Sequence, residues 1–113
     1  MGSISFVVPV LPGKEQAHRE WMDALAGARR EEYHSAWKNA GVTRHALWQQ
    51  QTANGTVDVV YLEADDVPAA MQDITTSDEP FQRWFRGRVL DVHGMDLTSQ
   101  APPRSEQIHD TTF

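Results

Sequence analysis

The sequence of 113 residues predicts an α+β domain of the ferredoxin-like type, a four-stranded antiparallel sheet with helices on one face. The first supporting observation is the order of its patterns, which is strand, helix, strand, strand, helix, helix, strand. The second is Asn54-Gly55, a dipeptide that favours the tight turn of a β-hairpin, between the two central strands. Two right-handed crossovers on either side of this hairpin give the expected β-α-β-β-α-β arrangement.

The first half of the chain contains a strand, a long helical pattern and a second strand. Residues 4–10 place apolar side chains at every second position from Ile4 to Val10, with Val7 on the other face, as in a strand. The apolar positions of 17–40 recur at steps of three and four, as in an amphipathic helix. A bend is expected at Gly27, because glycine costs about 1 kcal/mol inside a helix. Gly41 is expected to end the helix, and residues 42–51 form the second strand.

The second half repeats this plan with two short helices. The expected segments are a strand at 57–63, helices at 67–74 and 81–89, and a last strand at 92–97. Asp65 or Asp66 is expected to cap the first of these helices, and Ser77 or Asp78 the second. Residues 1–97 are therefore expected to form one domain. Residues 98–113 are polar and proline-containing, and we expect a flexible tail or an arm that contacts a partner subunit.

Composition excludes several classes of function. The net charge is −6 and the basic residues form no stripe, so nucleic acid is not an expected partner. No apolar run approaches the roughly 18 residues of a membrane span, so no membrane partner is expected. The chain has no cysteine, which excludes disulfides and thiolate chemistry, and a cytoplasmic location is the expectation.

The expected strands carry bulky apolar residues on both faces, although helices cover only one of them. A second sheet packed against the open face would cover it, so we expect a homodimer that associates sheet to sheet.

Three segments resemble a known superfamily: Val10–Glu15 between strand and helix, Tyr61–Asp66 before the second helical layer, and Ser77–Phe81. On these segments, residues 4–97 resemble the dimeric α/β-barrel superfamily, which includes antibiotic-biosynthesis monooxygenases, stress-responsive barrel proteins and aromatic polyketide cyclases. The likeness is greatest to an uncharacterised bacterial group of this fold. The resemblance implies a small pocket in each subunit, between the sheet and its helices, usually without a metal or an organic cofactor.

Two histidines are candidate catalytic residues. His93 is placed in the last strand beside Gly94, whose missing side chain could leave room for a ligand, and His45 lies in the second strand. Tyr61 and Glu63 share a face of the third strand. If strand pairing brings these residues together, a histidine with a tyrosine or glutamate acts as general acid or base. The alternative is a histidine hydrogen-bonded at the sheet edge or dimer interface.

Other residues are candidates for substrate binding. His34 lies near the expected bend, where its side chain could turn into the pocket, and Trp48 and Trp84 could wall a flat substrate. Solvated histidines and core tryptophans are the more common alternatives. Since no histidine pair has the His-x-x-x-His spacing of a helical zinc site, no metal site is expected, and His18 is assigned no role.

These observations lead to one functional hypothesis with two open alternatives. We expect a cofactor-independent enzyme that acts on an aromatic or polyketide-like substrate by acid–base chemistry, as a cyclase or isomerase. A cofactor-free monooxygenase and a non-catalytic ligand-binding or stress-associated dimer are the alternatives. Strand register determines which side chains face the pocket, because a slip of one residue would move His45 and His93 from the pocket to the dimer interface.

Overall fold

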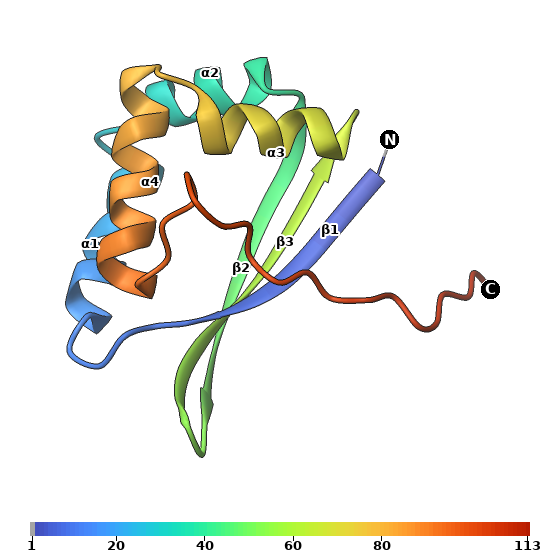
Figure 1. The fold of residues 1–113 in the computed structure, drawn as a ribbon, viewed down its shortest axis with the longest axis horizontal. Coiled ribbons are helices and arrows are strands. Elements are labelled where there is room, and N and C mark those ends of the chain that lie inside the picture. Colours follow the sequence, from blue (N-terminus) through green and yellow to red (C-terminus); the bar gives the residue numbers. More distant parts are fainter. Residues whose placement is uncertain (1) are drawn as a thin grey trace.

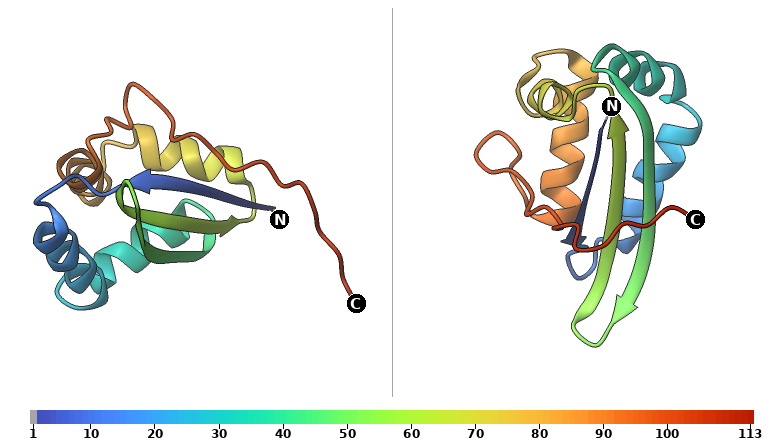
Figure 2. Two further views of the ribbon diagram at one scale, coloured as in Figure 1. Left: turned by 90° about the horizontal axis from the view of Figure 1, so that it is seen from below. Right: turned by 90° about the vertical axis from the view of Figure 1, so that its right-hand side faces the viewer.

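The computed structural model describes residues 2–113, within which the chain forms four helices and three strands. The elements in order are β1 (Gly2–Pro9), α1 (Glu15–Ala26), α2 (Arg30–Asn39), β2 (Val42–Thr52), β3 (Gly55–Ala64), α3 (Val67–Thr76) and α4 (Pro80–His93). The strands form an antiparallel sheet in the order β1-β3-β2. The helices pack on one face of the sheet, and the other face is open (Figures 1 and 2).

The side chains of the central strand β3 alternate between the two faces of the sheet. Asp58, Val60 and Leu62 are buried under the helices. The residues between them point to the open face, where Val59 lies between Val7 of β1 and Trp48 of β2 in the paired register. The prediction of a tight hairpin between β2 and β3 is confirmed: the turn residues are Ala53 and Asn54, and Gly55, at φ 119°, pairs with Thr52.

The expected bend in the first helix is a complete break. Gly27 has φ −128° and ψ −99°, which lies outside the helical region and ends α1 at Ala26. The helical pattern resumes with α2 after a turn in which the backbone N–H of Arg29 bonds to the Ala24 carbonyl. One amphipathic pattern thus produces two helices that run at an angle over the sheet (Figure 1).

The two later helices begin differently from one another. The Asp66 side chain accepts a hydrogen bond from the Ala69 N–H at 3.1 Å, as predicted for the first of them. The prediction that Ser77 or Asp78 caps the second is wrong, because Glu79 holds that position without a side-chain cap. Pro80 supplies the first turn, where its missing N–H costs nothing.

The predicted strand at 92–97 is wrong. Val92 and His93 form the last turn of α4, which runs to His93, and Gly94 ends it in the left-handed conformation at φ 70°. The space beside Gly94 holds Leu11 rather than a ligand, since a Cβ built there would lie 3.2 Å from Leu11 Cδ1. The sheet of residues 2–113 therefore has three strands instead of four.

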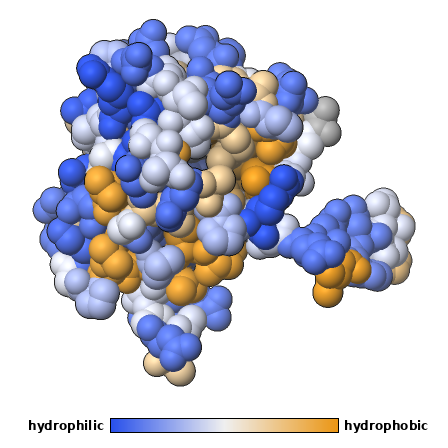
Figure 3. All heavy atoms as spheres, in the orientation of Figure 1, coloured by the Kyte–Doolittle hydropathy of each residue, from blue (hydrophilic) through white to orange (hydrophobic). Residues whose placement is uncertain are grey.

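The segment after α4 returns to the free edge of β1. Arg104 makes an isolated antiparallel bridge with Phe6, and the Ser105 N–H bonds to the Ser5 carbonyl at 2.7 Å. Pro102 and Pro103 precede this contact and lack the N–H groups that a longer ladder needs, so a single bridge forms where a fourth strand was expected. Beyond this point, the chain leaves the body as a narrow arm (Figure 3).

Within residues 2–113, none of the helices combines the length and apolarity that crossing a membrane requires.

Candidate functional site

An apolar cavity of about 60 Å³ lies between the sheet and its helices. Its aromatic walls come from Trp21 of α1, Trp37 of α2 and Phe85 of α4. Leu97 and Pro102 close it from the segment that follows α4. The cavity is therefore bounded by elements from the whole length of the domain.

His45 and His93 both border this cavity, and they are the ionisable side chains in its wall among the described residues. The register of β2 places His45 opposite Leu62, on the face that the helices cover. His93 reaches the cavity from the end of α4, although the sequence had placed it in a strand. The structure thus brings the two candidate histidines to one cavity, whereas their catalytic role stays a prediction.

His45 is held in an aromatic cage with one polar partner. Its Nδ1 lies 2.6 Å from the Tyr33 hydroxyl, and its ring centroid is 4.3 Å from that of Trp37. Burial lowers the pKa of His45 to about 4 and raises the pKa of Tyr33 to about 12. Both groups are therefore neutral near pH 7. Because a phenol hydroxyl both donates and accepts, Tyr33 supports either tautomer of the imidazole.

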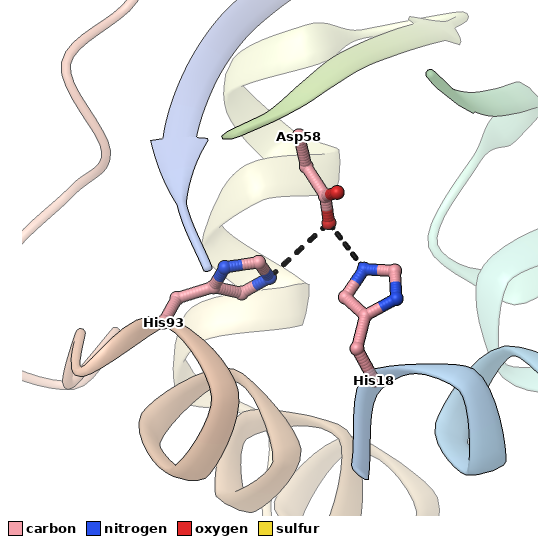
Figure 4. Close-up of side chains that lie close together, drawn as sticks. All are labelled: His18, Asp58 and His93. Atoms are coloured by element: carbon pink, nitrogen blue, oxygen red, sulfur yellow. Dashed lines mark hydrogen bonds and ion pairs between the residues drawn. The ribbon is translucent and has the colours of Figure 1, made fainter. Parts of the chain in front are cut away.

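The second polar group of the cavity belongs to a buried cluster of His18, Asp58 and His93 (Figure 4). His18 comes from α1, Asp58 from β3 and His93 from α4. The Nε2 atoms of both imidazoles face the same carboxylate oxygen, Asp58 Oδ2. His18 Nε2 bonds to this oxygen directly, and His93 Nε2 lies 3.6 Å from it.

The outer contacts of the cluster fix its orientation. His93 Nδ1 lies 2.7 Å from the Pro9 carbonyl oxygen, which can only accept, so this nitrogen carries the proton. Burial lowers the pKa of His93, while the Pro9 carbonyl and the Asp58 carboxylate act in the opposite direction. On the far side of the carboxylate, Gln49 Nε2 donates to Asp58 Oδ1 at 3.4 Å.

Trp21 adds an unsatisfied donor beside this cluster. Its side chain is 4% exposed, and its indole N–H finds no acceptor in residues 2–113. Its ring lies edge-on to those of His18 and His93, with centroids 5.9 and 5.8 Å away. A buried N–H without an acceptor costs about 1–3 kcal/mol, which an acceptor atom of a ligand would recover.

The structure places Tyr61, Glu63 and Trp48 on the open face of the sheet, away from the cavity. Tyr61 donates a hydrogen bond to Glu63 at 2.5 Å, and the Arg44 guanidinium lies 5.7 Å from the Tyr61 ring centroid. Hydrogen bonding to Glu63 raises the pKa of Tyr61. Trp48 is 55% exposed. These residues do not meet His45 or His93, since neighbours along a strand point to opposite faces.

His34 and Trp84 also lie outside the cavity. His34 borders a surface hollow with Tyr33 and Arg44. His45 and Trp37 form part of the walls of both the hollow and the cavity, so they separate the two spaces. Trp84 packs beneath Arg29, whose guanidinium carbon lies 4.3 Å from the ring centroid.

Sequence reasoning missed His18, Asp58 and Trp21 as members of one site, although a signal for each was present. His18 has the same helical phase as Trp21 and Leu25, the buried face of α1. Asp58 alternates in phase with Val60 and Leu62, which makes it a lone carboxylate on an apolar strand face. Their proximity could not be read from the sequence, because 40 residues separate His18 from Asp58.

The fold defines a ferredoxin-like α+β domain with an internal cavity, and the comparison with solved structures agrees. The crystal structure of L-rhamnose mutarotase from Formosa agariphila is similar, with a TM-score of 0.64. The match covers 99% of this chain and 100% of that one, at 13% sequence identity. At this identity the likeness concerns the fold alone. No protein-family model matches the sequence, and no curated protein matches it.

Proposed function

We propose that this chain is a small-molecule isomerase that moves a proton on an oxygen-bearing, mainly apolar substrate held in the cavity. The observation that carries the proposal is the cavity itself, whose apolar wall includes His45, His93 and Trp21, the last with an indole N–H that has no acceptor among residues 2–113. A mostly apolar pocket with a few convergent polar groups is the usual form of a small-molecule site.

The polar groups of the wall indicate the class of substrate. The Trp21 N–H calls for an acceptor such as a carbonyl oxygen, and the aromatic walls suit a flat ring system. A sugar would bring several hydroxyls into this wall, and each one left unpaired would cost about 1–3 kcal/mol. An aromatic or polyketide-like carbonyl compound is therefore favoured over a sugar.

Such a substrate requires the cavity to expand. Drug-sized ligands occupy pockets of roughly 300–1,000 Å³, well above the present volume of about 60 Å³. Three methionines line the wall, Met22, Met71 and Met95, and their flexible side chains can repack around a ligand. The segment that carries Pro102 is joined to the edge of β1 by one bridge and one backbone hydrogen bond, and its displacement would enlarge the cavity. The site is thus suited to adapt on binding.

The two polar ends of the cavity have different roles in the proposed reaction, proton transfer at one end and binding of the substrate oxygen at the other. His45 is neutral, and with Tyr33 on its Nδ1 its Nε2 can take a proton from carbon or return one. At the other end, the Trp21 indole N–H holds the substrate oxygen, on which negative charge develops when the adjacent C–H bond breaks. Return of the proton at a different atom completes the isomerisation without an oxidant or reductant. The proposal assigns no proton transfer to Tyr61, which lies on the other face.

Sugar mutarotation is the second candidate function. It is favoured by the structural likeness to L-rhamnose mutarotase, which extends over almost the whole of both chains. The apolar wall argues against this function, because it would leave hydroxyls of a sugar without hydrogen-bond partners. Exchange between the anomers of L-rhamnose, followed by NMR with and without the protein, tests it directly.

Solvent hydrogen exchange tests the leading proposal. The protein is incubated in D₂O with enolisable aromatic and polyketide-like ketones, and loss of the α-proton signal is followed by NMR. We expect catalysed exchange with the wild type, a large loss in His45→Asn and no loss in the exposed His34→Asn control. Exchange at the uncatalysed rate, together with no ligand-induced rise in melting temperature, would leave the non-catalytic dimer as the better description.

We also propose that two copies associate through the open face of the sheet. Val7 and Trp48 are 50% and 55% exposed there, and Val59 joins them in one apolar row across the strands. The C-terminal arm projects from the body on this side, and its Ile108 is 90% exposed (Figures 1 and 2). A second copy on this face would cover the row and meet the arm.

Sedimentation velocity tests the association. We expect the wild type to sediment as a dimer and Trp48→Glu to sediment as a monomer. Leu90→Glu is the matched control, because Leu90 is 51% exposed on α4, away from the open face. A monomeric wild type at micromolar concentration would contradict the proposal.

A further inference from the structure

We propose that His18, Asp58 and His93 bind a divalent transition-metal cation, with Zn²⁺ as the reference ion. One carboxylate oxygen and two imidazole nitrogens, all from buried residues, lie within 4.8 Å of one another. Two histidines and one carboxylate are a common ligand set for metals that keep open coordination positions. The inference concerns ion binding, and it does not depend on the proposed isomerase activity.

The contacts of His93 carry the argument. Because its Nδ1 donates to the Pro9 carbonyl, the Nε2 of the neutral ring has a bare lone pair. That lone pair faces Asp58 Oδ2 at 3.6 Å, and a carboxylate oxygen is also an acceptor. Two buried acceptors directed at each other repel unless a cation lies between them. Metal-binding histidines usually donate their other ring N–H to a carbonyl or carboxylate, as His93 does here.

The rest of the cluster is consistent with a positive ion. Asp58 is 0% exposed and directs its carboxyl group at both imidazoles. His93 is the last residue of α4, where the helix dipole favours a cation. His18 Nε2 already contacts the same oxygen, so an ion replaces the proton of that hydrogen bond. Gln49 holds the other carboxylate oxygen and leaves Oδ2 directed at the imidazoles.

The ligand types select the class of metal. Calcium and magnesium prefer six or more oxygen ligands, whereas imidazole nitrogens suit zinc and iron. Tetrahedral metal–ligand bonds of about 2.0–2.2 Å place neighbouring ligand atoms about 3.3–3.6 Å apart. The three atoms reach this spacing by modest rotations of the imidazoles, because both rings already face one oxygen (Figure 4).

The position of the cluster indicates what the ion would do. His93 is also part of the cavity wall, so an ion on its Nε2 lies beside the cavity. The unpaired Trp21 N–H is adjacent to both histidines and could donate to an oxygen bound to the ion. A cation here would polarise a substrate oxygen, with His45 left to transfer the proton.

Calorimetric titration with Zn²⁺ alone tests the site on the intact chain after treatment with a chelator. We expect one ion per chain, with the affinity reduced at least about 100-fold in Asp58→Asn and His93→Gln. His34→Gln and His109→Gln remove exposed imidazoles and should leave the affinity unchanged. No binding by the wild type, or equal binding by all variants, would overturn the proposal and leave the cluster as a hydrogen-bond network.

A second measurement uses only the wild type, so its result does not depend on whether the variants fold. Zn²⁺ should shift the NMR signals of the His18 and His93 rings, and those of His34 and His109 should stay in place. Shifts confined to the exposed histidines would overturn the proposal. His45→Asn should bind Zn²⁺ as the wild type does, so loss of isomerase activity in that variant is separable from loss of the ion.

Discussion

The burial of His45 predicts that this protein loses stability in acid through one identifiable imidazole. The pKa of His45 is lowered from 6.5 to about 4 by the surrounding aromatic rings and the loss of water. Above pH 6.5 the imidazole is neutral in both the folded and the unfolded chain, so it contributes no pH dependence. Between pH 6.5 and 4 the unfolded chain binds a proton that the folded chain does not, and stability falls as the pH falls.

The size of this effect follows from the two pKa values. Each pKa unit corresponds to about 1.4 kcal/mol, so the fall from 6.5 to about 4 amounts to about 3 kcal/mol. This is an upper value, since the ring also borders the surface hollow. Below pH 4 both states bind the proton, and the contribution of His45 no longer changes.

Urea unfolding at several pH values from 7 to 4 measures the effect. Carboxylates also titrate in this range, so the quantity to follow is the difference in free energy of unfolding between wild type and His45→Asn. Asparagine can present an acceptor near the position of Nδ1 to the Tyr33 hydroxyl, and it does not titrate. We expect the wild type to lose up to about 3 kcal/mol more than the variant. A difference that stays constant with pH would refute the reasoning.

Three further predictions concern the core and the chain ends. Gly94→Ala should lower the free energy of unfolding by about 1–2 kcal/mol in urea titrations, because it places a Cβ at φ 70° against Leu11, whereas Gly87→Ala should not. Phe85→Ala should cost about 3–5 kcal/mol in the same assay, since this ring is 6% exposed and packs on Trp21 and Trp37. Removal of residues 100–113 should increase the fluorescence of an apolar dye by opening the cavity at Pro102, and removal of 106–113 should not.

Much of the helical and strand structure could be predicted because its signals are local. The hairpin depends on Asn54-Gly55, and the start of α3 on the Asp66 side chain, so neighbouring residues suffice for both. The end of the chain could not be predicted in this way. The sequence predicts a strand from Val92 to Leu97, yet its first residues complete a turn of α4 whose apolar face is already buried. Packing of that helix overrode the local pattern.

The candidate site shows the same division. Periodicity in the sequence is enough to group Asp58 with Val60 and Leu62 on one strand face, and His18 with Trp21 on one helix face. The meeting of these two faces, and the position of His93 beside them at the end of α4, result from the packing of the folded chain. Contacts between residues 40 or more positions apart depend on strand register and helix packing, which are properties of the whole chain. The sequence therefore indicates which residues of each element face the same side, whereas the contacts between elements that form the site depend on the complete fold.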